Sequence, residues 1–511
     1  MNDSATDWGL LEQAALPRYA IRVDNCSGLT PSSERLAHAP QHRNISECFF
    51  LADSIELSST DSDILISAIL CIASLILCFA ATRRSIVAGV IATMAIGYFY
   101  GIVRGNIEQS TSHFIYDAGV LGLYLAALTR FYSPLAKHRM RRVVRWVLVL
   151  TVWPLLIFLI PSQDFLIRLV GLRASIFFLP FLMVGAMMDV AECRQLARAL
   201  TILNAMVLAI ALAEVTFGLA HFFAVSNPVN LTIFRSQDII YGGSNHYRIP
   251  ATFVSSAAYG TDMVGSIPFL IGGLMHEDRR SRWRYFILSA VGFAAVGVFL
   301  SGSRSAVAFL LVLALFVVGH HSSLNLPRGL GIASIAICVA LVAFTPRMQR
   351  FITLQDTDYL ARRVHGSVNS DFIARALDYP MGNGLGGGGT SLPYFLHDRV
   401  SSQVVLENEY ARIMFEQGIP GLLLWLSFIG WLTLRQAGRH ATQRGKSIAR
   451  VFCLLSFATA PLGLGLLDAI PGTEMLLILA GWCTAPDPVI SWARQSKPTN
   501  RRLGENAASA A

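Results

Sequence analysis

Residues 130–160 read RFYSPLAKHRMRRVVRWVLVLTVWPLLIFLI, and this stretch changes character near its middle. Residues 130–145 carry six lysines and arginines and no acid, whereas residues 146–160 carry no charge at all. A basic segment that leads directly into an apolar one is typical of a cytoplasmic loop followed by a membrane-spanning helix. We therefore predict a membrane protein that holds residues 130–145 in the cytoplasm.

The composition of the whole chain excludes a string of soluble domains. Of its 511 residues, 54% are hydrophobic and 14% charged, and the mean hydropathy is +0.52. The 41 basic residues exceed the 32 acidic ones and give a net charge of +9. In a soluble protein that excess would suggest nucleic acid. Here the positive-inside rule explains it, so we expect no nucleic-acid partner.

Apolar segments recur along most of the chain and predict the fold class. A spanning helix needs roughly 20 apolar residues, so we expect an all-α, polytopic transmembrane helix bundle of about 12–13 spans. The segments lie at about 63–81, 86–103, 113–129, 146–160, 165–188, 199–223, 250–274, 285–301, 304–319, 329–345, 416–434, 450–467 and 472–485.

Successive spanning helices place successive loops on alternate sides of the membrane. Counting helices from the basic linker therefore assigns each remaining loop to one side. The other basic stretches then fall in the cytoplasm: Arg83/Arg84, Arg194/Arg198, Arg279–Arg284, Arg435–Arg450, and a tail with Arg494, Lys497, Arg501 and Arg502. The predicted parts are a polar N-terminal tail (1–62), ten transmembrane helices (63–345), a large, partly helical periplasmic loop (346–407), C-terminal transmembrane helices (408–485) and a cytoplasmic tail (486–511). The same count leaves residues 1–60 outside, although they contain no cleavable signal. A mistaken span or an added N-terminal extension would also explain that result.

Several arginines gather on the predicted outer side. They are Arg104, Arg168, Arg173, Arg248 and Arg304, each within or beside an apolar segment. A guanidinium grips phosphate oxygens through two parallel hydrogen bonds, so Arg173, Arg248 and Arg304 are candidates to bind an anionic lipid headgroup. The alternative for each arginine is a structural role, either reaching to the membrane interface or capping a helix.

The long outer loop ends in carboxylates that could act in proton transfer. Glu407 and Glu409 stand where an amphipathic helix begins, and Glu407 is the candidate general base. The alternative is structural, because acids are favoured in any first helical turn. Glu409, Arg412 and Glu416 also have the spacing of a salt-bridge ladder. His397 and His365, in the same loop, are the other candidate bases.

The glycine-rich stretch GNGLGGGG (382–389) is predicted to be a flexible or tightly turning loop whose amides approach substrate. It contains a literal GxGxxG, but no βαβ unit surrounds it, so we expect no dinucleotide cofactor. The cysteines lack zinc-site spacing and the chain lacks HExxH, so no metal is expected either.

Seven short motifs follow one another along the chain: RGN (104–106), YDAGVLGLYL (116–125), GLRASIFFLP (171–180), YRIPATFVSSAAYG (247–260), SGSRSA (301–306), GNGLGGGG and ENEYARIMFEQGIPGLLLW (407–425). In this order they resemble the motifs of the bacterial O-antigen ligase and polymerase superfamily, particularly its exopolysaccharide polymerases. The resemblance spans roughly residues 98–434. It implies a metal-independent, GT-C-like membrane glycosyltransferase of the bacterial inner membrane, with its active site facing the periplasm. In the ligases a histidine precedes the motif asparagine, here Asn408. Glu407 takes that place in this chain, which favours the polymerase branch.

The resemblance also implies the substrate and partners. The donor is an undecaprenyl-diphosphate-linked oligosaccharide, which Arg173, Arg248 and Arg304 would bind, while Asn408 and Tyr410 would position the sugar. Membrane lipid, a chain-length regulator and a flippase of the same pathway are the expected partners. Two alternatives stay open: a ligase that transfers glycan to a lipid or protein acceptor, and a transporter that moves such lipids without chemistry.

Overall fold

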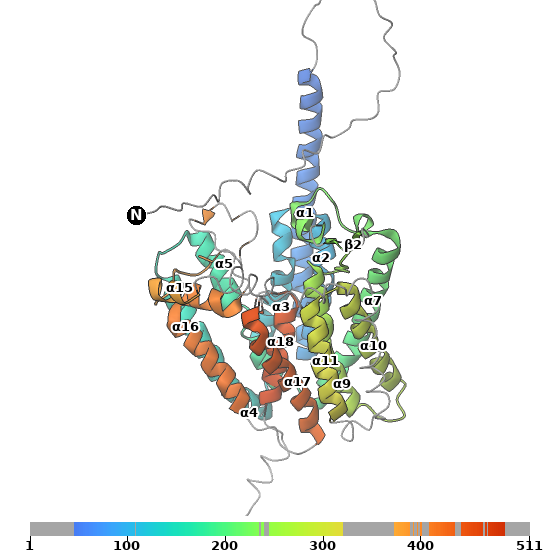
Figure 1. Cartoon of the computed structure of the whole chain (residues 1–511), viewed down its shortest axis with the longest axis vertical. Coiled ribbons are helices and arrows are strands. Elements are labelled where there is room, and N and C mark those ends of the chain that lie inside the picture. The colour runs from blue at the N-terminus through green and yellow to red at the C-terminus, as the bar shows by residue number, and fades with distance from the viewer. Residues whose placement is uncertain are drawn as a thin grey trace, which may run out of the picture. The chain divides into compact units, whose positions relative to one another are not determined.

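A computed structural model describes residues 45–107, 109–234, 237–239, 245–319, 372–388, 392, 396, 399–400, 408–434, 441–462, 466–467 and 469–485 (Figure 1). The chain divides into residues 1–57 and residues 58–511. Of the first unit only residues 45–57 are described, and they are helical.

The regular secondary structure of the described residues is helical except for one short hairpin. The longer helices are α1 (Ile45–Arg84), α2 (Ile86–Asn106), α3 (Ile115–Leu128), α4 (Pro134–Phe158), α5 (Phe165–Ile176), α6 (Phe181–Met187), α7 (Val190–Phe217), α9 (Ser256–His276), α10 (Trp283–Ser301), α11 (Arg304–Gly319), α15 (Phe372–Asp378), α16 (Glu409–Leu434), α17 (Ala441–Thr459) and α18 (Gly472–Thr484). Short 3₁₀ turns include η1 (Ser110–Phe114), and α8 (Leu231–Phe234) is a single turn. The strands β1 (Gln237–Ile239) and β2 (Asn245–Tyr247) pair antiparallel, with Gln237 opposite Tyr247.

Six of these helices are long and apolar enough to cross a membrane. They are Ser62–Arg84, Ile86–Asn106, Phe165–Met187 (α5 with α6), Val190–Phe217, Trp283–Ser301 and Glu409–Leu434. The protein is therefore a multi-pass membrane protein, as its composition indicates. Helices α3, α4, α9, α11, α17 and α18 coincide with other expected segments but fall short in length or in apolar character. Of these, α4 contains most of the segment expected at 146–160, and its first half carries the basic residues of the linker. The expected segment 329–345 lies outside the described residues.

Short polar side chains begin many of the helices. Ser85, Ser133 and Ser255 each accept a hydrogen bond from a first-turn backbone N–H of α2, α4 and α9. Asp189 and Glu192 form a reciprocal capping box at the start of α7. Such caps satisfy backbone donors that the helix itself leaves without a partner. The polar residues between the apolar runs thus fix where the helices begin.

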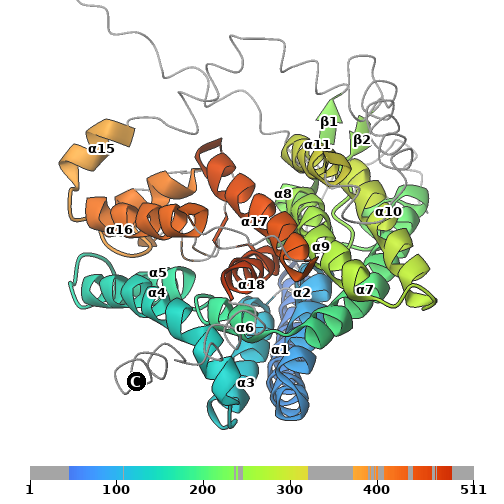
Figure 2. The same cartoon turned by 90° about the horizontal axis from the view of Figure 1, so that it is seen from below.

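Helix α18 lies among the other helices and packs against α6, α9 and α17 (Figure 2). The backbones of α6 and α18 approach closely through two glycines. A Cβ at Gly185 would stand 2.0 Å from the Ile478 carbonyl oxygen, and one at Gly481 would stand 2.1 Å from that of Leu182. Small residues at such positions are what lets two membrane helices touch along their backbones.

Candidate functional site

Arg173 forms a two-point ion pair with Asp117. Its Nε donates to Asp117 Oδ2 at 2.9 Å and its Nη2 donates to Oδ1 at 2.5 Å. Arg173 stands in the last turn of α5 and Asp117 in the first turn of α3. Their side chains are 26% and 15% exposed, and the guanidinium carbon lies 5.2 Å from the centre of the Phe178 ring. The arginine is thus held in one orientation while part of it stays accessible.

Three further residues complete this group, which we call the Arg173 cluster: Tyr100, Arg104 and His113. The Tyr100 hydroxyl donates to the backbone oxygen of His113 at 3.1 Å, and its charged neighbours are Arg104, Asp117 and Arg173. Burial, followed by the positive charges of Arg104 and Arg173, lowers the pKa of His113 to about 3. With His113 neutral, the described residues of the cluster comprise two guanidinium groups and one carboxylate. This described part of the cluster therefore carries more positive than negative charge, which suits an anion.

Arg248 and Arg304 are held on a different set of elements. The amide of Ile249 donates to the Leu300 oxygen at 3.3 Å, which ties the chain beside Arg248 to the end of α10. Arg304 opens α11 four residues later. The loop that follows Arg248 packs against α2. The backbone oxygen of Thr252 accepts from the Ile102 amide at 2.9 Å, and the Thr252 hydroxyl donates to the Tyr98 oxygen. This contact lies one turn before Arg104, so the loop that follows Arg248 meets the end of α2 that carries the Arg173 cluster.

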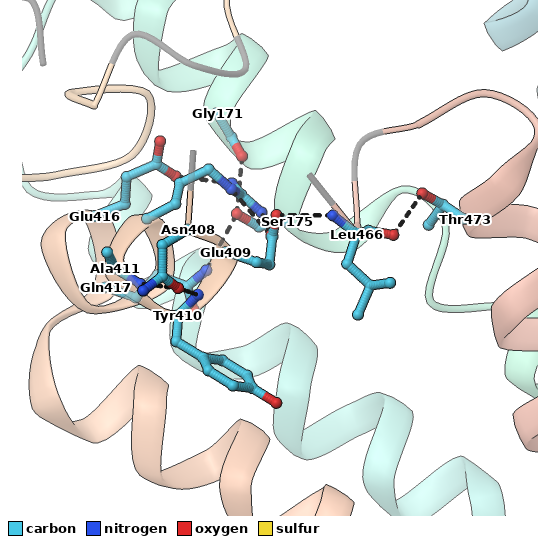
Figure 3. Close-up of polar contacts among 11 residues, drawn as sticks. Gly171, Ser175, Asn408, Glu409, Tyr410, Ala411, Glu416, Gln417, Leu466 and Thr473 are labelled. Carbon is cyan, nitrogen blue, oxygen red and sulfur yellow. Dashed lines mark hydrogen bonds and ion pairs between the residues drawn. The ribbon is translucent and has the colours of Figure 1, made fainter. Parts of the chain in front are cut away.

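The start of α16 holds a buried charge network instead of an open carboxylate (Figure 3). Arg412 donates through Nε to Glu409 Oε1 at 3.0 Å, through Nη2 to the same oxygen, and through Nη1 to Glu416 Oε2 at 3.1 Å. The side chains of Glu409, Arg412 and Glu416 are 2%, 2% and 0% exposed. Glu409 Oε2 also accepts from the Leu466 amide at 3.2 Å. The salt-bridge ladder predicted as the alternative for Glu409 is confirmed.

Asn408 and Tyr410 have contacts inside the protein. Asn408 Oδ1 accepts from the amides of Tyr410 and Ala411 at 2.9 and 3.3 Å, so Asn408 caps α16. The Tyr410 hydroxyl donates to the Phe457 oxygen at 2.6 Å. Both residues therefore fix the place where the long loop ends, and their role in positioning a sugar stays a prediction.

The glycine-rich stretch turns tightly against two helices. Gly382, Gly384 and Gly386 have φ of 92°, 97° and 75°, which residues with a Cβ rarely adopt. A Cβ on Gly171 of α5 would lie 2.3 Å from the Gly386 nitrogen, and the Asn383 amide donates to the Phe415 oxygen of α16 at 2.7 Å. The predicted tight turn is confirmed over residues 382–388.

Both helices beside this stretch are interrupted. Residues 177–180 separate α5 from α6, and α16 is kinked at Gly418, whose φ is 71°. A hydrogen bond connects the end of α5 with the kink of α16: Gln417 Nε2 donates to Ser175 Oγ at 3.3 Å (Figure 3). Arg173 itself stands in the last turn of α5, beside the first of these interruptions. Its helix ends three residues later, since Phe177, Phe178 and Pro180 occupy the turn.

The remaining predicted residues divide into two groups. Arg168 caps the end of α4 by donating to the oxygens of Phe158 and Ile160 at 2.8 and 3.3 Å, the structural alternative for this arginine. Glu407, His397 and His365 lie outside the described residues.

Sequence reasoning missed Asp117 and His113 as members of the site. The signal for Asp117 was an acid at the start of an otherwise apolar segment, which is costly unless it has a partner. Fully buried Glu474 was also missed. It accepts from the Thr93 and Tyr116 hydroxyls at 2.6 Å each, and Tyr116 directly precedes Asp117. Among the described residues no group of three or more His, Cys, Asp and Glu side chains could hold a metal ion.

Comparison of the chain with protein-family models, with curated proteins and with solved structures gave no match.

Proposed function

We propose that this protein is an inner-membrane glycosyltransferase that polymerises undecaprenyl-diphosphate-linked oligosaccharide repeat units into exopolysaccharide or O-antigen. The observation that carries the proposal is the Arg173 cluster. Among its described residues two guanidinium groups outnumber one carboxylate beside an apolar helix, and a lipid-linked diphosphate requires such a combination of positive charge and lipid access.

The proposed reaction joins a saccharide hydroxyl to an anomeric carbon and releases lipid diphosphate. Charge on the departing diphosphate must be stabilised, and a proton must leave the attacking hydroxyl. Arg173, with Arg104 beside it, would serve the first need, and Arg248 and Arg304 would extend the same surface. Glu407 would take the proton, or His397 in its place. Asn408 and Tyr410 fix the helix that begins directly after Glu407.

The architecture proposed around this chemistry is a GT-C-like bundle of about 12–13 spans. Its 346–407 loop and active site face the periplasm. Neither a metal nor a cofactor takes part. A flippase that delivers the donor and a chain-length regulator are the proposed partners in the pathway.

A transporter is the second candidate, and one observation favours it. Transporters often bind substrate where two helices are interrupted side by side. The break between α5 and α6 meets the kink of α16 through the bond from Gln417 to Ser175. A flippase for the same lipid would use the same arginines without forming a bond.

Purified protein supplied with lipid-linked repeat units distinguishes these functions. Longer lipid-linked chains support the polymerase. Transfer of glycan to an added lipid or protein acceptor, without lengthening, supports the ligase. Movement of donor across proteoliposomes without any new bond supports the transporter. Single Arg→Lys variants of Arg173, Arg248 and Arg304 test whether these arginines bind the donor diphosphate. Full polymer output from all three variants contradicts that role.

A second comparison identifies the base. Glu407→Gln should lower the chemical rate by roughly 100-fold or more while donor binding persists. Near-normal turnover in Glu407→Gln together with an inactive His397→Ala transfers the role to His397. If both variants polymerise normally, neither residue is the base.

A further inference from the structure

Helix α4 presents a row of positive charges on one face of its first half. Lys137, Arg141, Arg142 and Arg145 are all exposed. Lys137, Arg141 and Arg145 recur every four residues and Arg142 lies three residues before Arg145, so the four share one side of the helix. We call them the basic face. The opposite face of the same turns is buried, with Arg139 directed inward to the Met187 oxygen at 3.4 Å. The four cations therefore point away from the protein.

The same face of α4 becomes apolar one turn further on. Leu148, Val152, Leu155 and Leu159 are exposed and continue the spacing that begins at Lys137. α4 packs against α5, α6 and α16 and lies at the edge of the helices (Figure 2). A helix face that turns from cations to exposed aliphatic side chains matches the boundary between lipid headgroups and acyl chains.

Neighbouring segments extend the positive charge and add apolar anchors. Arg130 donates to the Arg83 oxygen at 3.2 Å, which joins the end of α1 to the linker before α4. In that linker and the turn before it, Leu128 and Phe131 are 82% and 104% exposed. No Asp or Glu occurs in residues 118–163. Basic residues interleaved with exposed apolar ones are typical of a surface that lies in the headgroup layer.

This surface lies at the other end of the bundle from the Arg173 cluster. Arg84 precedes α2 and Arg104 lies in its last turn, so the 21-residue helix separates them by about 30 Å. Asp117 begins α3 and Arg130 follows its end. That separation equals the thickness of a bilayer's hydrocarbon core. The basic face therefore lies too far away to contact a substrate bound at the Arg173 cluster.

We propose that the basic face of α4 binds the headgroups of anionic phospholipids in the membrane leaflet on that side. The charge is complementary, the side chains are accessible, and the adjoining apolar face places them at headgroup depth. Each cation held near an anionic leaflet strengthens the association, so four aligned cations give a marked preference for anionic over zwitterionic lipid.

The test uses the purified full-length chain in detergent micelles, titrated with dansyl-labelled phosphatidylglycerol or phosphatidylcholine. Energy transfer from the protein's tryptophans, of which Trp146 and Trp153 lie on α4, reports binding. Wild type should bind the phosphatidylglycerol probe at least about tenfold more tightly than the phosphatidylcholine probe, and the preference should weaken as salt rises. Equal affinity for the two probes overturns the proposal.

Changing all four residues of the basic face to Gln should abolish most of the preference. The matched control is Arg279→Gln/Arg280→Gln/Arg282→Gln. It removes three exposed arginines from a loop that also carries acids, and it should leave the preference within about twofold. Arg141→Lys/Arg142→Lys/Arg145→Lys keeps the charge and should bind like wild type. If the four Gln substitutions prevent folding, the double variant Lys137→Gln/Arg141→Gln replaces them. A folded variant without the basic face that keeps the full preference also refutes the proposal.

Discussion

Replacing Arg412 by glutamine should destabilise the protein severely. Arg412 is the cation that donates to both carboxylates of the Glu409–Arg412–Glu416 network. Its side chain is 2% exposed. Removing it would leave two carboxylates buried in the start of α16 without their shared cation.

The magnitude follows from burial. Breaking a buried ion pair by deleting one partner costs about 3–5 kcal/mol, because the remaining charge is uncompensated. Glu416→Gln should cost much less, about 1 kcal/mol, because Arg412 keeps Glu409 and the excess negative charge disappears. Arg83→Gln is the matched control, since Arg83 is exposed and donates to the Thr129 hydroxyl. Its cost should stay within about 0.5 kcal/mol.

The free energy of unfolding of the three variants can be compared by denaturant titration in detergent micelles. We expect the loss of unfolding free energy to increase with the uncompensated buried charge that each substitution leaves. Arg412→Gln should therefore show a much larger loss than Glu416→Gln or Arg83→Gln. If Arg412→Gln lies within about 1 kcal/mol of wild type and matches Arg83→Gln, the network contributes little stability and the reasoning is wrong.

Three further predictions follow from the site. Arg173→Lys loses one of the two bonds to Asp117 and should lower polymer output about 10- to 100-fold at normal membrane abundance, measured per inserted protein. The pKa of His113 is lowered to about 3 from 6.5, so its neutral ring contributes stability above pH 6.5 that is lost as pH falls from 6.5 toward 3. Unfolding at stepped pH should show a fall of at most about 1.4 kcal/mol per unit in wild type and a flatter profile in His113→Gln. A Cβ at Gly171 would meet backbone of the glycine-rich stretch, so Gly171→Ala should lower the melting temperature. Gly292→Ala, in open space on α10, should leave it unchanged or raise it.

Helices whose ends coincide with charged or capping residues could be predicted from the sequence. The segments expected at 86–103, 285–301 and 304–319 correspond to α2 (Ile86–Asn106), α10 (Trp283–Ser301) and α11 (Arg304–Gly319). In each, an apolar run is bounded by an arginine or a serine, and that local contrast sets the ends of a membrane helix.

Features set by contacts between distant residues could not be predicted. The segment expected as one span at 165–188 is divided by the turn at 177–180. The segment expected from 416 begins at Glu409, because Arg412 neutralises the acids of its first turns. Asp117 and Arg173 stand 56 residues apart, and nothing in the spacing of either indicates that one holds the other. Hydropathy measures the cost of burying each charge alone and cannot reveal which partner offsets it.

The proposed function requires this chain to form glycosidic bonds with a lipid-linked diphosphate saccharide as the donor. The most direct measurement is mass spectrometry of the products when purified protein is incubated with undecaprenyl-diphosphate-linked repeat units. We predict a ladder of lipid-linked saccharides spaced by one repeat unit, with one undecaprenyl diphosphate released for each bond formed. If a preparation that binds the donor leaves it unchanged, the result would contradict the proposed polymerase function.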